Sequence, residues 1–421
     1  MRFTMIAIGS MGDVRPYILL GEELNKRGHH ITIAAFEPFR EAVINAGLDF
    51  APLSGDVTKF MATVMSPGTN GLNYLPRLET CLRDIASTLP NDLMASCQNA
   101  EAIICTYFGS MIYSIAEKKQ IPCVQTHYYP MDYNASFPIS SAPNIKLGKV
   151  WNKTTYKVGY LMISALERRY LKEWRRNQGV SIRKIKSAPD YSICGHVVPV
   201  IYAMSPLIMP RPISWGAHIR MTGYWLNEES TDYVPPPELM AFLAKKPKPV
   251  YIGFGSMVSG DMGNTLETVI KAVKEAGVRA VMLKGWSGQE IPESDHIYAA
   301  DYIPHDWLFE YVTAVVHHGG AGTTAAGLRA GCPTLVVSFG GDQPFWGSRV
   351  RALGCGPKPI KRENLTVPKL TAALNDLTQN ETYKIAAQEL GIRLKSEKGI
   401  HNAADTIEEE IHKWLKTPPQ P

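Results

Sequence analysis

The chain has 421 residues, of which 45% are hydrophobic and 20% charged, and its formal net charge is +5. These values are typical of a soluble globular protein with enough length for two sizeable hydrophobic cores. The mild positive charge does not indicate a nucleic-acid partner, and no apolar run reaches the roughly 18 residues that a bilayer-spanning helix needs.

The seven cysteines are scattered and form no C-x-x-C pair. An odd number of cysteines without metal-ligand spacing fits a reducing cytosol with free thiols. The opening MRFTMIAIGS has an apolar core too short for a secretion signal and indicates a first strand instead. We therefore expect a cytoplasmic protein.

The first half of the chain alternates between strand and helix patterns, which favours a parallel sheet covered by helices. Helices are predicted to begin near Pro16 and Pro38, and the first of them ends at Gly28. The expected strands cover 3–8, 30–36, 102–108 and 122–128, and the expected helices cover 16–27, 38–46 and much of 72–100.

An aromatic run follows the last of these strands, with Tyr128, Tyr129, Met131 and Tyr133 in close succession. Aromatic walls suit a flat apolar molecule, so this run is a candidate acceptor pocket, although plain packing explains each residue equally well. His127, at the strand end itself, is a candidate second participant in the chemistry.

The segment 146–186 carries twelve Lys or Arg against two Glu, with apolar residues between the charges. One interpretation is a solvated pair of amphipathic helices. The other is a surface that makes a peripheral contact with anionic membrane lipid, which would present a lipophilic acceptor.

The segment 227–248 contains a triple proline and a Lys-Pro cluster and is predicted to link two domains. After it the pattern restarts, because 250–257 echoes 8–11. A helix is expected over 265–276, a strand over 280–284, and helices from Val367 onward. We predict a first domain over 1–226, a second over 249–400, and a last helix within 401–421 that crosses back to the first domain.

The stretch 314–347, AVVHHGGAGTTAAGLRAGCPTLVVSFGGDQPFWG, reads as a strand, a tight glycine turn, a helix and a second strand. Backbone N–H groups at such a turn point toward one place at the positive end of the helix, which suits a phosphate. His318 is expected to face this crevice because His317, its neighbour on the strand, points the other way. The second strand ends at Asp342 and Gln343, and parallel strands leave these ends side by side.

These residues resemble a known signature. HHGGAGTT over 317–324 and GDQPFWG over 341–347, together with IGSMGDVRP over 8–16, 250–257 and IPHDW over 303–307, resemble glycosyltransferases with two Rossmann-like domains, the GT-B fold. The most similar branches are the sterol glucosyltransferases and the antibiotic glycosyltransferases. The resemblance extends over most of the chain and implies an α/β fold of two Rossmann-like domains that face one another across a cleft.

The resemblance also implies roles for particular residues. The first domain would bind the acceptor and the second the nucleotide sugar. Asp342 and Gln343 would hold the sugar hydroxyls, while Trp307, with Ile303, would contact the nucleobase. The residues expected around the donor diphosphate are Ser256, His318, Gly320, Gly322, Thr323 and Thr324.

Transfer of a sugar to a hydroxyl requires a base for the acceptor proton, and Asp13, after the first strand, is the candidate. The plant relatives have histidine at the matching place, whereas the antibiotic and sterol branches have aspartate. Asp13 before a helix is equally a natural cap. A single displacement would invert the anomeric carbon, as in the similar branches. No DxD triplet or His/Cys ligand spacing occurs, so we expect metal-independent transfer without a cofactor, with cationic help from His318, the backbone amides and the helix end.

We expect the donor to be UDP-glucose and the acceptor a lipophilic hydroxyl compound such as a sterol, triterpenoid, flavonoid or polyketide. Plant relatives place a ribose-binding glutamate where this chain has Ala326, so a transferase using a thymidine diphosphate deoxysugar remains open. So does an NAD(P)-dependent oxidoreductase, since GAGTTA over 320–325 also fits a dinucleotide fingerprint. A third alternative is a non-catalytic nucleotide-sugar-binding protein. Asp342 could also simply cap the following helix.

Overall fold

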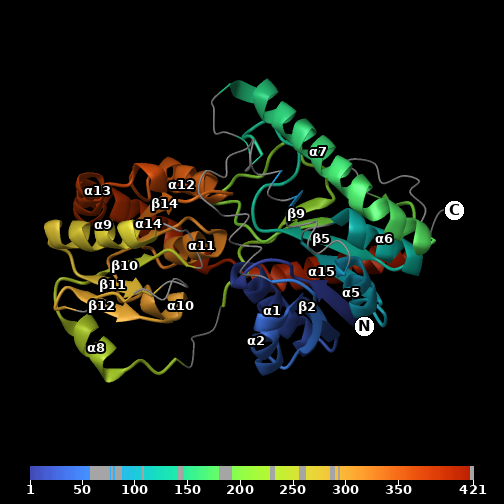
Figure 1. Ribbon diagram of the computed structural model, residues 1–421, viewed down its shortest axis with the longest axis horizontal. Coiled ribbons are helices and arrows are strands. Elements are labelled where there is room, and N and C mark those ends of the chain that lie inside the picture. Colours follow the sequence, from blue (N-terminus) through green and yellow to red (C-terminus); the bar gives the residue numbers. More distant parts are fainter. Residues whose placement is uncertain are drawn as a thin grey trace.

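The computed structural model describes residues 1–56, 76, 79–80, 88–106, 109–139, 142, 147–179, 192–227, 233–255, 262–284, 290–292 and 294–417. It consists of two lobes, each built on a parallel sheet with helices against it (Figure 1). The expected α/β fold with two Rossmann-like units is confirmed.

The first lobe contains a seven-stranded sheet in the order β3-β2-β1-β4-β5-β8-β9, in which every neighbouring pair is parallel. Its inner strands are largely buried because helices cover the sheet, whereas β3 and β9 at the two edges are only partly buried. The strands are β1 (Arg2–Ile6), β2 (His30–Phe36), β3 (Asp49–Leu53), β4 (Ala102–Cys105), β5 (Cys123–His127), β8 (Val200–Tyr202) and β9 (Ile219–Met221), and β6 (Ser192–Ile193) and β7 (His196–Val197) form a separate antiparallel pair. The helices are α1 (Met11–Lys26), η1 (Glu37–Phe39), α2 (Arg40–Asn45), α5 (Leu89–Ser96), α6 (Gly109–Lys119) and α7 (Gly148–Asn177).

The second lobe contains a six-stranded parallel sheet in the order β12-β11-β10-β13-β14-β15. Its strands are β10 (Val250–Gly253), β11 (Ala280–Leu283), β12 (Ile297–Ala300), β13 (Ala314–His317), β14 (Thr334–Ser338) and β15 (Ile360–Lys361). Its helices are α8 (Pro237–Ala244), α9 (Met262–Glu275), α10 (His305–Leu308), α11 (Ala321–Arg329), α12 (Gln343–Ala352), η2 (Arg362–Asn364), α13 (Val367–Gln379) and α14 (Glu381–Lys395).

Two helices differ from the sequence interpretation. α8 falls inside the segment predicted as a linker, and its buried Leu239, Phe242 and Leu243 pack with the second lobe. The basic segment was interpreted as a helix pair, but its described part from 148 to 177 is the single long helix α7, which lies along the outer edge of the first lobe (Figure 1).

The last helix, α15 (Gly399–Lys416), leaves the second lobe and packs against α1 in the first lobe. Its buried face, which includes Ile407 and Ile411, joins the hydrophobic core of that lobe. Arg27 donates from Nη1 to Asp405 Oδ1 at 2.6 Å and to Glu408 Oε2 at 2.7 Å, which adds charge-assisted bonds to the contact.

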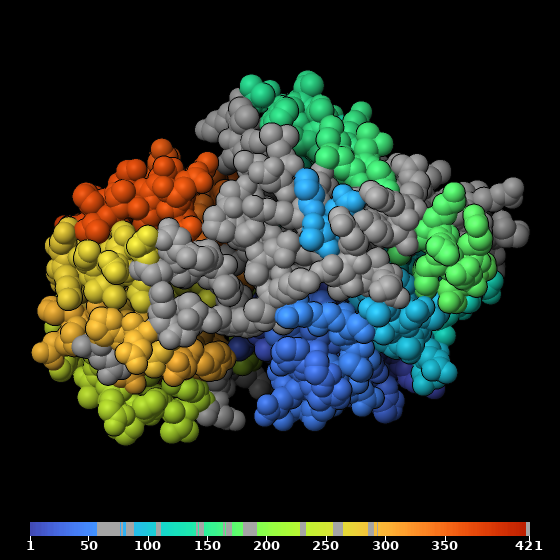
Figure 2. Space-filling model, viewed as in Figure 1, coloured from blue at the N-terminus to red at the C-terminus, as the bar shows by residue number. Residues whose placement is uncertain are grey.

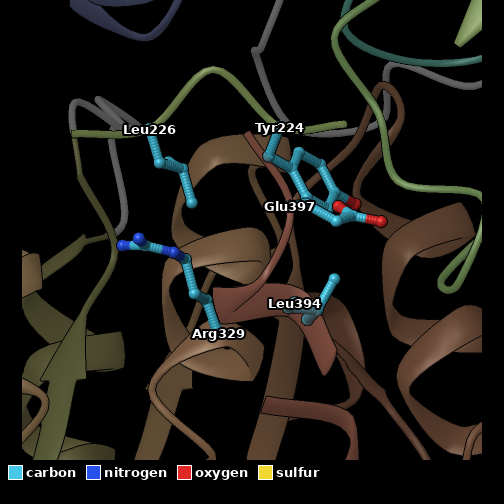
Figure 3. A pocket seen from close by; sticks show the side chains of 5 residues that line it. All are labelled: Tyr224, Leu226, Arg329, Leu394 and Glu397. Carbon is cyan, nitrogen blue, oxygen red and sulfur yellow. The ribbon is translucent and has the colours of Figure 1, made fainter. Parts of the chain in front are cut away.

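The chain crosses between the lobes at two neighbouring points, after β9 and before α15. A Cβ atom on Gly399 would lie 2.0 Å from the carbonyl oxygen of Tyr224, and one on Gly223 would lie 3.3 Å from Gly399 Cα. The two backbones therefore touch, and only glycine permits this approach. A small pocket beside the crossings is lined by Tyr224, Leu226, Arg329, Leu394 and Glu397 (Figure 3).

Candidate active site

In each sheet the strand order reverses at one point, where two neighbouring strands send their connections in opposite directions. Parallel sheets with this order bind ligands at that switch point, outside the carboxyl ends of the two strands. In the first lobe this point lies between β1 and β4, and in the second it lies between β10 and β13. Asp13 follows β1, and the His318 turn follows β13. The predicted base and the predicted phosphate turn therefore lie at equivalent places in the two lobes.

Asp13 lies inside the first turn of α1, which begins at Met11 and not at Pro16 as predicted. The reason is a capping box: Ser10 caps the helix, and Asp13 Oδ2 accepts from the Ser10 backbone N–H at 2.8 Å and from its hydroxyl at 3.1 Å. A Cβ atom on Gly9 would lie 2.2 Å from that same oxygen. The cap alternative is therefore a real structural role of Asp13, and these contacts also hold its carboxylate in one orientation.

The glycine turn after β13 holds the two histidines differently. His317 is completely buried, and its Nδ1 accepts from the Gly319 backbone N–H at 2.9 Å. Gly319 has a φ of +98°, and a Cβ atom there would lie 2.7 Å from Val336 Cγ1. A Cβ atom on Gly320 would lie 2.5 Å from His318 Nε2. Glycine at 320 therefore allows the His318 ring to lie directly against the turn, and glycine at 319 allows the positive φ and the close approach to Val336.

His318 is neutral at pH 7 in this structure. Burial lowers its pKa to about 4, and a hydrogen bond to the backbone of Gly253 offsets only part of that effect. Its Nδ1 is buried without a hydrogen-bond partner. Desolvation therefore disfavours the charged ring in the ligand-free protein, and the cationic help expected of His318 toward a bound diphosphate stays a prediction. A neutral ring still offers an N–H donor to an anion.

The helix that follows the turn presents its positive end. Gly320 is the N-cap of α11, and no side chain caps its backbone N–H groups. Gly322 is exposed, with nothing within 4 Å of an added Cβ atom, and Thr323 is partly exposed. Thr324 differs, because it is fully buried and its hydroxyl donates to the Gly320 carbonyl at 2.8 Å. Thr324 thus supports the turn and does not present a hydroxyl at its surface.

Asp342 and Gln343 lie where β14 gives way to α12. Asp342 occupies the N-cap position, but its side chain does not cap the helix; its Oδ2 accepts from Trp346 Nε1 at 2.7 Å. The Gln343 Oε1 accepts from the backbone N–H of Phe339 at 2.6 Å, which fixes the loop. Burial raises the pKa of Asp342 to about 6, the Trp346 N–H lowers it, and the charge of Asp13 raises it further. The carboxylates of the two lobes therefore act on one another electrostatically.

The predicted nucleobase residues differ in exposure. Trp307 is partly exposed on α10 and lies edge-on to Tyr233 at 5.1 Å between ring centroids. The Ile303 side chain is 1% exposed and belongs to the hydrophobic core, so only its backbone can face a ligand. α10, which carries Trp307, packs against α11, the helix that begins at the glycine turn. Ser256 lies outside the described residues.

The four predicted acceptor residues lie at the end of β5, where His127 is the last strand residue, and directly after it. Tyr128 is buried, and its hydroxyl donates to the Asp13 carbonyl at 3.0 Å, so it supports the Asp13 turn. Tyr129 and Met131 are partly buried. Burial lowers the pKa of His127 to about 3, and its Nδ1 has no hydrogen-bond partner. His127 is therefore a neutral ring whose Nδ1 is available for a hydrogen bond.

Two site features escaped the sequence interpretation. Arg15, two residues after Asp13, donates from Nη1 to the Tyr302 hydroxyl at 3.0 Å and lies 4.0 Å from Asp306 Oδ2, both in the other lobe. Tyr202 Oη accepts the backbone N–H of Met131 at 3.0 Å and thereby holds the acceptor segment. In the sequence, only the closeness of Arg15 to Asp13 suggests a role for Arg15. Nothing in the sequence indicates that Tyr202 holds the acceptor segment.

Two negative findings concern only the described part of the chain. It contains no group of three or more His, Cys, Asp or Glu side chains arranged to hold a metal ion. None of its helices combines the length and the apolar character that crossing a membrane requires.

Comparison with known families gives two matches that together cover both lobes. Residues 3–137 match the glycosyltransferase family 28 N-terminal domain, and residues 284–409 match the erythromycin biosynthesis protein CIII-like C-terminal domain. The chain is also similar to the sterol 3-beta-glucosyltransferases of Neosartorya fischeri, with 35% identity over 99% of the chain, and of Pichia angusta, with 35% identity over 97%. It spans only 30% and 33% of the lengths of these two relatives.

Solved structures share the fold at low sequence identity. The kitacinnamycin glycosyltransferase aligns with a TM-score of 0.69 at 18% identity and covers 97% of this chain and 98% of its own. The calicheamicin glycosyltransferase CalG4 aligns with a TM-score of 0.68 at 16% identity and covers 100% and 99%. The two domain matches, the sterol glucosyltransferase relatives and the fold agree, and the chain belongs to the glycosyltransferases of the GT-B fold.

Proposed function

We propose that this protein transfers a hexose, glucose from UDP-glucose, to a hydroxyl group of a lipophilic acceptor of the sterol class. The observation that carries the proposal is that Asp13 and the His318 turn occupy the switch points of two lobes joined by Arg15 and Tyr302. The sterol choice is supported by similarity to sterol 3-beta-glucosyltransferases over nearly the whole chain. The closeness of the two lobes here suits a reaction that joins a donor held by one lobe to an acceptor held by the other.

In the proposed reaction the donor diphosphate lies on the uncapped N-terminus of α11, where Gly322 allows close approach. His318 and Thr323 add N–H and O–H donors, and these groups stabilise the charge that develops on the leaving phosphate. When the diphosphate is bound, its negative charge raises the pKa of His318 and favours the protonated ring.

Asp342 and Gln343 hold and orient the sugar hydroxyls in this proposal. Asp13 accepts the proton of the acceptor hydroxyl as its oxygen attacks the anomeric carbon and the bond to the diphosphate breaks. One displacement from the opposite face inverts the anomeric configuration. We propose that transfer proceeds without a metal ion or cofactor, with the helix end and the amides supplying the positive potential.

The proposal is tested with a donor panel of UDP-glucose and TDP-glucose and an acceptor panel of a sterol, a flavonoid and a macrolide, read as product mass gain. We expect a gain of one hexose on the sterol with UDP-glucose, a β-configured product, and unchanged rates in EDTA. Loss of turnover in EDTA would refute metal independence. Release of UDP without any glycosylated acceptor would contradict the proposed transfer, because the protein would then only bind or hydrolyse the nucleotide sugar.

A second candidate is a transferase that uses a thymidine diphosphate sugar. It is favoured by the fold neighbour SsfS6, whose structure is complexed with thymidine diphosphate, and by Ala326 at the position of the plant ribose-binding glutamate. The same panel decides between them, since this candidate requires turnover with TDP-sugars to exceed turnover with UDP-glucose.

A further inference from the structure

α7 exposes apolar side chains on the face that points away from the first lobe. These residues, which we call the α7 outer face, are Leu147, just before the helix, Val150, Val158, Leu161 and Met162. Val150 is 78% and Leu161 61% exposed. Single exposed apolar residues are ordinary on a protein surface, but five within about four helical turns on one side of a helix are not.

The charges around the α7 outer face have one sign. Lys149, Lys153 and Lys157 are exposed between its apolar residues. The sequence 146–166 contains four lysines and no Asp or Glu. A helix that combines an exposed apolar face with flanking lysines is suited to lie in the interface of an anionic membrane. In the space-filling view α7 lies along the upper edge of the molecule (Figure 2).

The opposite face of α7 holds the segment that follows β5. Asn152 Nδ2 donates to the Ala135 carbonyl at 2.9 Å, and the Tyr160 hydroxyl donates to the Met131 carbonyl at 2.6 Å. The hydroxyl of the fully buried Tyr156 accepts from Asn134 Nδ2 at 2.7 Å. The same helix therefore carries exposed apolar and basic groups outward and positions the predicted acceptor segment inward.

We propose that the α7 outer face docks on an anionic lipid bilayer and so places the acceptor segment next to lipid. The inference rests on the proposed function in one respect, because a sterol-class acceptor resides in the bilayer from which this segment would receive it. The exposed lysines provide the charge complementarity to anionic headgroups, and the apolar side chains enter the boundary between headgroups and acyl chains.

The test is co-sedimentation of the full chain with vesicles of phosphatidylcholine alone or mixed with phosphatidylglycerol. We expect binding to the mixed vesicles and little to phosphatidylcholine. The V150E/L161E double variant should lose at least about tenfold in partitioning, and the K149Q/K157Q variant about fivefold per lysine. The matched control is Ile392→Glu, since Ile392 is 73% exposed on α14 in the other lobe; it should bind like the wild type.

Equal vesicle binding by the wild type and V150E/L161E would overturn the proposal, as would absent binding of the wild type to mixed vesicles. Gel filtration without lipid tests whether a second copy of the chain covers the α7 outer face. A wild-type dimer that the V150E/L161E variant converts to a monomer would show that the face is a dimer interface and would overturn the proposal. Circular dichroism and UDP binding establish that the variants are folded.

The failure of docking can be told apart from the failure of the proposed function. If the function holds, V150E/L161E should glycosylate a sterol delivered in cyclodextrin at the wild-type rate and a vesicle-embedded sterol at a much lower rate. If no acceptor is glycosylated in either form, the proposed function fails, while the sedimentation result still decides whether α7 binds lipid.

Discussion

Arg15 and Tyr302 join the two lobes beside the site, with 3.0 Å between Arg15 Nη1 and the Tyr302 hydroxyl oxygen. Arg15 lies two residues after Asp13 on the same helix turn, and Asp306 lies 4.0 Å away on the other lobe. The contact therefore ties the position of the proposed base to the loop that leads into α10. Because both Arg15 and Tyr302 are substantially exposed, its effect on stability should be small.

We expect Arg15→Ala to lower kcat/KM by about tenfold while the free energy of unfolding changes by less than about 1 kcal/mol. Tyr302→Phe, which removes only the hydroxyl, should lower kcat/KM less. The measurements are steady-state kinetics and urea unfolding. Unchanged kinetics for Arg15→Ala would show that the contact does not position Asp13 during turnover.

The base assignment predicts that Asp13→Asn lowers kcat by about 100-fold or more, with the Kd for UDP nearly unchanged. Ser10→Ala is the matched control, because it removes the capping hydroxyl that contacts the same carboxylate. It should cost about 1 kcal/mol of stability and leave most of the turnover. If Asp13→Asn retained most of its turnover, Asp13 would be a helix-capping residue and nothing more.

Alanine substitutions at Gly322 and Gly319 distinguish an effect on phosphate binding from an effect on folding. Gly322→Ala should leave stability unchanged or raise it by about 0.5–1 kcal/mol, because the site is open and alanine favours a helix. It should nevertheless weaken UDP binding about tenfold by blocking close approach to the turn. Gly319→Ala should instead destabilise the fold, since its Cβ would lie 3.0 Å from the Gln343 carbonyl oxygen at a φ of +98°. Calorimetric titration with UDP and thermal unfolding measure the two effects; full UDP affinity in Gly322→Ala would argue against the phosphate site.

Buried neutral histidines predict a loss of stability in acid. Burial lowers the pKa of His305 and of His318 to about 4, against about 6.5 in the unfolded chain. The folded state binds the proton less readily, so this stability is present above pH 6.5 and is lost as pH falls toward 4. Each ring should cost about 2 kcal/mol between pH 7 and pH 5, as an upper bound. Asp342 acts in the opposite direction, because its pKa is raised to about 6.

Urea unfolding at pH 7 and pH 5 tests this expectation. His305→Gln should lose less stability than the wild type over the same pH interval, by up to about 2 kcal/mol. The Tyr251 hydroxyl, which lies 2.9 Å from His305 Nε2, provides a second check. Tyr251→Phe should lower stability at pH 7 and also alter its pH dependence, because the lost hydroxyl is a hydrogen-bond partner of the titrating ring.

Local patterns predicted most of the fold, because buried strands and glycine turns leave clear sequence signals. β2 has the predicted bounds, and β13, the glycine turn and α11 follow in the predicted order. The predicted start of α1 at Pro16 was wrong. The helix begins at Met11 because the Ser10–Asp13 capping box, which is present in the sequence, starts it before the proline. The box could have been recognised from its three-residue spacing alone.

Properties that depend on tertiary packing could not be predicted from the sequence. The charge state of His318 follows from burial among groups that are distant in sequence. The contact between Arg15 and Tyr302 joins positions 287 residues apart. The Thr324 hydroxyl faces the backbone of its own helix turn, which the residue type does not reveal. The binding roles assigned to the site residues stay predictions until a nucleotide complex is examined.

The two backbone crossings at Gly223 and Gly399 have a mechanical consequence. All covalent connections between the lobes pass through this one spot, where a Cβ on Gly399 would lie 2.0 Å from the Tyr224 carbonyl oxygen. The lobes also share a buried hydrophobic cluster, in which Tyr202 and Trp215 of the first lobe lie with Leu328 and Trp346 of the second. A side chain at either glycine would therefore push the two crossings apart and disturb the packing of one lobe against the other.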